Sequence, residues 1–142
     1  MIAVDTNILV YAHRADAPFH DAAQRAIRDL VEENRLWALP WPCIHEFLAK
    51  VTHARIFKNP TPLERAIDQV VEWLRCPSAR TIGEPEGYLG TFSNLVLEAQ
   101  VVGAKIHDAR IAALCLAHGV DELWSADRDF SRFAMVPVRN PL

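Results

Sequence analysis

The chain begins with a short apolar run that stops abruptly at polar residues. Residues 2–4 are apolar and are followed at once by Asp5-Thr6-Asn7, which is typical of a buried strand that leads into a polar turn. Similar runs at 36–39, 122–125 and 135–138 predict further strands, and 80–82 has room for one more.

Stretches with apolar residues at helical spacing lie between these runs. They predict helices at 8–13, 20–34, 63–74, 88–102 and 107–118, together with a helix that Pro40-Trp41-Pro42 opens. Short strands separated by helices indicate an α/β domain with a mainly parallel central sheet flanked by helices. A length of 142 residues suits one domain, so we expect residues 1–142 to form a single unit.

Composition limits the possible partners and compartment. With 51% apolar and 23% charged residues, the chain can form a folded core. Its net charge of −3 means that contact with a polynucleotide would need a local patch or a metal ion. Three cysteines without C-x-x-C spacing, no basic signal region and no apolar run of ~18 residues favour a cytoplasmic protein that spans no membrane.

Acidic residues follow the predicted strands or begin the predicted helices. Asp5 follows the first strand, and Asp127 comes just after the strand at 122–125. Glu46 lies near the start of the helix after the second strand, and Asp108 opens the helix after Gly103. In a parallel sheet these positions meet at the carboxyl edge, where ligands bind.

Each acid also has an ordinary structural explanation. Asp5 and Asp108 could be helix N-caps, Asp127 could be a turn residue and Glu46 could lie on a solvated helix face. Together, however, four like charges at one edge repel each other unless a cation compensates them. A hard, oxygen-binding ion such as Mg²⁺ or Mn²⁺ would do so.

The ordered set Asp5-Thr6-Asn7, Glu46, Asp108 and Ser125-Ala126-Asp127 resembles the PIN domain. The resemblance covers roughly residues 1–138 and is strongest to the VapC-type toxins of bacterial toxin–antitoxin pairs. It implies a metal-dependent endoribonuclease in which the four acids hold one or two Mg²⁺ or Mn²⁺ ions. A bound ion lowers the pKa of its water and neutralises charge on the scissile phosphate.

The resemblance also suggests supporting residues and partners. Thr6, Asn7 and Ser125 match positions that orient ligands, water or phosphate, and Asp129 could be an outer acid. A VapB-like antitoxin that blocks the acidic pocket, an RNA substrate and a homodimer are implied. The basic residues Lys50, His53, Arg55 and Lys58 form either an RNA track or a solvated face.

Two other functions stay open at this level. The chain could be a PIN nuclease outside a toxin pair, acting in RNA processing or on DNA. It could also be a catalytically silent binding module that keeps its acids for structure. The intact set of four acids speaks against the silent module.

Overall fold

The computed structural model describes residues 1–142, and its centre is a five-stranded, wholly parallel sheet. The strand order is β3-β2-β1-β4-β5. The strands are β1 (Ile2–Val4), β2 (Trp37–Pro40), β3 (Ala79–Ile82), β4 (Glu122–Trp124) and β5 (Val138–Arg139). The predicted α/β fold with a parallel sheet is confirmed.

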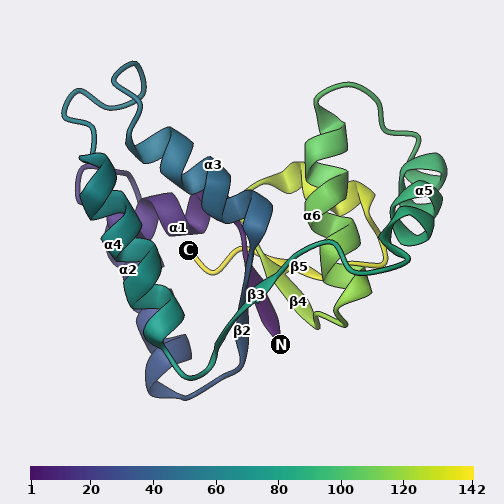
Figure 1. The fold of residues 1–142 in the computed structure, drawn as a ribbon, viewed down its shortest axis with the longest axis horizontal. Coiled ribbons are helices and arrows are strands. Elements are labelled where there is room, and N and C mark those ends of the chain that lie inside the picture. Colours follow the sequence, from purple (N-terminus) through teal and green to yellow (C-terminus); the bar gives the residue numbers. More distant parts are fainter.

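Helices flank the sheet in two groups (Figure 1). One group consists of α1 (Thr6–His13), α2 (His20–Glu32), α3 (Trp41–Val51) and α4 (Leu63–Arg75). The other consists of α5 (Tyr88–Ala99) and α6 (Lys105–Ala117), and a short 3-10 helix (Arg128–Arg132) follows β4. Because helices cover the sheet, β1 and β2 are buried at every position, which explains their continuous apolar sequences.

The core lies between these layers and is filled by large side chains. Trp37, Phe47, Phe130 and Phe133 are fully buried. Phe47 of α3 packs edge-on against Trp73 of α4, with their ring centroids 5.0 Å apart. No helix of the structure has the length and apolar content that a membrane crossing requires.

Sheet register places the carboxyl ends of β1 and β4 side by side. Val4 pairs with Trp124 in parallel register, so the next residues, Asp5 and Ser125, leave the sheet as neighbours. The Asp5 backbone N–H donates to the Trp124 carbonyl oxygen at 2.9 Å. The first strand ends where the fourth ends, and this brings residues 120 positions apart into one site.

The last predicted strand is wrong in its position. The sequence predicts it at 135–138, but β5 is Val138–Arg139 and pairs with Leu123 and Trp124 of β4. Met135 is instead 65% exposed, because the Val136 N–H donates to the Phe133 carbonyl and closes a turn there.

Several helix boundaries also differ from the prediction by one to three residues. The helix expected at 107–118 begins at Lys105, so Asp108 lies in its first turn and is not its N-cap. The helix expected at 88–102 ends at Ala99, because Gln100 adopts a left-handed conformation with φ of 52°. Glu46 is the sixth residue of α3, one turn further along than the sequence suggested.

Candidate active site

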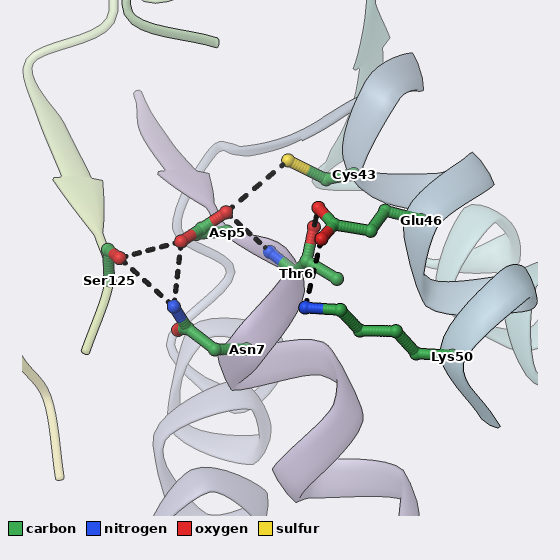
Figure 2. A network of polar contacts seen from close by, with 7 residues as sticks. All are labelled: Asp5, Thr6, Asn7, Cys43, Glu46, Lys50 and Ser125. Carbon is green, nitrogen blue, oxygen red and sulfur yellow. Dashed lines mark hydrogen bonds and ion pairs between the residues drawn. The ribbon is translucent and has the colours of Figure 1, made fainter. Parts of the chain in front are cut away.

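Asp5 is the buried centre of the site, with only 4% of its surface exposed. It caps α1, and its Oδ1 accepts the Thr6 backbone N–H at 2.7 Å. The other carboxylate oxygen, Oδ2, accepts the Ser125 hydroxyl at 2.6 Å and the Asn7 side-chain amide at 2.8 Å (Figure 2). The Cys43 thiol contacts Oδ1 from α3 at 3.7 Å. Every partner is a donor, so the carboxylate has a fixed orientation.

Asn7 and Ser125 connect Asp5 to the segment after β4. The Asn7 Oδ1 accepts the Ala126 backbone N–H at 3.1 Å. The Ser125 Oγ accepts the Asp127 backbone N–H at 3.0 Å while it donates to Asp5. These bonds fix the backbone of Asp127 relative to Asp5. That Asn7 and Ser125 orient ligands, water or phosphate stays a prediction.

Glu46 faces the N-terminus of α1 from α3. Its Oε2 accepts the Thr6 hydroxyl at 2.8 Å, and its Oε1 pairs with the Lys50 ammonium at 2.9 Å (Figure 2). The Lys50 partner lies one turn later on the same helix. Thr6 therefore links Glu46 to Asp5, since its backbone bonds one acid and its hydroxyl bonds the other.

A second group of acids lies beside this network. Asp108, Asp127 and Asp129 each offer a carboxylate oxygen, and these oxygens all lie within 4.8 Å of one another. Asp5 and Glu46 are outside that group. The structure therefore brings the four predicted acids to one edge in two neighbouring sets, joined through Ser125 and Asn7.

Lys105 supplies positive charge to the second group. Its ammonium lies 3.6 Å from the Asp108 carboxylate and bonds the Asp129 carboxylate directly. Sequence reasoning missed this residue. The available signal was its spacing, because a lysine three residues before an aspartate on a helix lies on the same face.

Burial governs the ionisation of Asp5. The pKa of Asp5 is raised from 3.8 to about 6, chiefly by desolvation and to a smaller extent by the negative charge of Glu46. The hydrogen bonds from Ser125, Thr6 and Cys43 act in the opposite direction. Burial also raises the pKa of the Cys43 thiol well above 9.0, so this group is a neutral donor.

The donor set fits a hard divalent cation. All candidate ligand atoms are carboxylate oxygens, which Mg²⁺ and Mn²⁺ prefer over nitrogen or sulfur. The buried charge of Asp5 has hydrogen bonds but no cationic partner, and the second group relies on one lysine for three carboxylates. An added cation would stabilise both sets.

Comparison with known proteins decides the family. The model of the PIN domain matches residues 2–135. The chain belongs to the PIN-domain family. The curated relatives of this PIN domain include Ribonuclease VapC43 of Mycobacterium tuberculosis, 34% identical over 142 residues that cover 100% of this chain and 96% of the relative. Ribonuclease VapC48 of the same organism is 30% identical over 137 residues, 96% of this chain and 94% of the relative.

Solved structures share the whole fold. VapC20 of Mycobacterium tuberculosis, described as a toxin that cleaves the sarcin-ricin loop, superposes with a TM-score of 0.71 at 17% identity and covers 99% of this chain and 100% of its own. VapBC2 from Rickettsia felis, solved with a DNA fragment from its promoter, gives 0.72 at 20% identity, over 99% of this chain and 98% of its own. At these identities the likeness shows the fold.

Replacing Lys105 with Met is expected to tighten Mn²⁺ binding about fivefold. A bound metal ion would compete with the lysine for the same carboxylates, and unit charges about 4 Å apart in water interact by about 1 kcal/mol. Calorimetric titration of the RNA-free protein with Mn²⁺ measures the change. Lys58→Met is the matched control, because Lys58 is exposed and contacts none of these acids. Unchanged or weaker Mn²⁺ binding in the Lys105 variant would contradict the competition.

Proposed function

We propose that this chain is a metal-dependent endoribonuclease that acts as the toxin of a type II toxin–antitoxin pair. The observation that carries the proposal is the acidic edge, where Asp5 is buried and oriented entirely by donors beside the group of Asp108, Asp127 and Asp129. Membership of the PIN family and full-length relatives named VapC ribonucleases support the same reading.

The catalytic and metal-binding residues that we assign are Asp5, Glu46, Asp108 and Asp127. A Mg²⁺ or Mn²⁺ ion held by them would lower the pKa of a water molecule and offset the charge of the scissile phosphate. Asp129 lies close enough to Asp108 and Asp127 to act as a further ligand.

The protein's own side chains keep these acids ready. Asn7 and Ser125 hold the Asp5 carboxylate, so its free lone pairs keep one direction. Thr6 holds Glu46 close to Asp5, and Lys50 offsets part of the repulsion between the two acids. Because these carboxylates are already in position, they need to move little when a ligand binds.

The partners follow from the same family evidence. Structures similar to this chain include VapBC2 and FitAB, each solved with a bound DNA fragment. We infer that an antitoxin protein covers the acidic edge of this chain and that the chain forms a homodimer. RNA is the substrate, and Mg²⁺ or Mn²⁺, as one or two ions, is the cofactor.

Cleavage of total bacterial RNA by the purified chain, freed of any partner, tests the function. Discrete fragments are expected with Mn²⁺ or Mg²⁺, and none with EDTA. Asp108→Asn should slow cleavage about a hundredfold, because the loss of a carboxylate weakens the hold on the ion. Asp68→Asn, an exposed acid on α4, is the matched control and should cut normally.

Other outcomes would support the other functions. Cleavage of single-stranded DNA at the same rate as RNA would indicate a PIN nuclease outside a toxin pair. Folded protein that neither cuts RNA nor binds Mn²⁺ would indicate a silent binding module and would overturn the proposal.

A further inference from the structure

A groove of about 470 Å³ opens beside the acidic edge, between α1 and the loop after α3. Its volume lies within the roughly 300–1,000 Å³ that small-molecule sites occupy. The residues that matter for its chemistry are Asn7, Tyr11, Lys50, Ile56, Phe57 and Lys58. None of the contacts that position the four acids depends on Tyr11 or on the three residues of the loop.

The groove shares two walls with the candidate active site. Asn7 lines the groove and donates to Asp5 at 2.8 Å. Lys50 lines it as well and pairs with Glu46 at 2.9 Å. A ligand in the groove therefore lies directly beside the acids that would hold the metal.

The aromatic side of the groove is held in place by contacts outside it. The Arg14 guanidinium lies 4.2 Å from the centroid of the Phe57 ring and donates to the Asn59 carbonyl at 2.8 Å. The Tyr11 ring packs against Phe19, with centroids 5.9 Å apart. The two Arg14 contacts hold the loop after α3 against the end of α1, so the groove exists before a ligand arrives.

The one charged side chain of the groove lining that has no ion-pair partner is positive. Lys58 is exposed and forms no ion pair, whereas Asp16, the acid in the lining, is paired with Arg14 at 2.6 Å. Ile56 in the wall is 53% exposed, so its apolar surface is available to a ligand in the groove. Apolar walls beside an unpaired ammonium suit a flat base that carries a phosphate.

The geometry points to a subsite for one unpaired nucleotide of the RNA, next to the phosphate that is cut. The base packs on Ile56 and Phe57, and its phosphate lies on Lys58. This inference rests on the proposed ribonuclease function and adds which side chains hold the nucleotide beside the cut. The subsite favours an unpaired base, because a paired base would have to break its pairing and stacking to enter the groove.

RNA binding tests the subsite in an Asp5→Asn background with Mn²⁺, which prevents cleavage during the measurement. The probe is a fluorescent, mixed-sequence RNA decamer, used single-stranded and as a duplex. Ile56→Ala is expected to weaken binding of the single strand about fivefold without changing the salt dependence. Lys58→Ala is expected to lower the slope of log K against log salt by about 0.7, the value of one phosphate contact. Neither substitution should change the affinity for the duplex or the salt dependence of duplex binding.

Two matched controls separate the subsite from general surface effects. Leu97→Ala removes another exposed apolar side chain, from α5 and outside the groove. Arg55→Ala removes an exposed charge that lies three residues from Lys58 in the sequence and outside the groove. If the Asp5→Asn parent binds RNA and the groove variants bind it as the control variants do, the proposed subsite is wrong. A protein segment would then be the remaining candidate for the groove. If the parent binds no RNA and the wild type cuts none, it is the proposed function that fails.

Discussion

Replacing Asp5 with Asn is expected to reduce RNA cleavage by about a thousandfold. The substitution removes the one buried carboxylate of the site, and the lost metal interaction is worth several kcal/mol, with about 1.4 kcal/mol for each factor of ten. The effect should exceed that of Asp108→Asn, because Asp108 is partly exposed and water can replace its oxygen. Single-turnover cleavage at saturating Mn²⁺ measures it.

The hydrogen bonds around Asp5 make this variant a demanding test. All of its partners donate, so an Asn amide would point one N–H group toward another donor, Ser125 or Asn7 on one side and Thr6 or Cys43 on the other. Circular dichroism and thermal unfolding must therefore show that the variant is folded. A folded Asp5→Asn protein that cuts RNA at the wild-type rate would remove Asp5 from the site.

The carboxyl edge of the sheet could be predicted because its signals are local. The run at residues 2–4 and its abrupt end at Asp5 mark both the strand and the cap of the next helix. The strand before Ser125 has the same form. Since all strands are parallel, the ends of these two strands meet, and that rule needs no knowledge of side-chain packing.

The division of the acids into two sets could not be predicted from the sequence. It depends on the register that pairs Val4 with Trp124, and on which side chains reach which carboxylate. Lys105 enters the site because α6 begins two residues earlier than its apolar pattern suggested. The final strand was misplaced for a similar reason, since its two residues form an edge and carry almost no pattern.

The roles of the basic residues became clear only from their surroundings. Lys50, His53, Arg55 and Lys58 look alike in the sequence as a short basic stretch. In the structure Lys50 is paired with Glu46, and Lys58 faces the groove without a partner. These side chains therefore do not share one role, and whether each contacts RNA or is only solvated must be decided residue by residue.

Metal-free protein is expected to lose stability as the pH rises from about 4 to about 6. The pKa of Asp5 is about 6 in the folded chain and near 3.8 as a free side chain, so the folded state binds the proton more tightly. Between these two values the folded state holds more protons than the unfolded state, and raising the pH lowers the free energy of unfolding. The difference between these two pKa values corresponds to about 3 kcal/mol in the free energy of unfolding, and all of it is lost above pH 6.

Urea unfolding in EDTA between pH 4.5 and 7.5 measures this loss as the difference between wild type and Asp5→Asn. The variant has no carboxylate at position 5, so its free energy of unfolding should fall less over this range, and the histidines cancel in the comparison. Asp68→Asn should follow the wild type. Saturating Mn²⁺ should restore the stability of the wild type at pH 7.5 and have a much smaller effect on Asp5→Asn, because only an ionised Asp5 gains from the ion. If the free energies of unfolding of wild type and Asp5→Asn changed in parallel with pH, burial would not raise the pKa of Asp5.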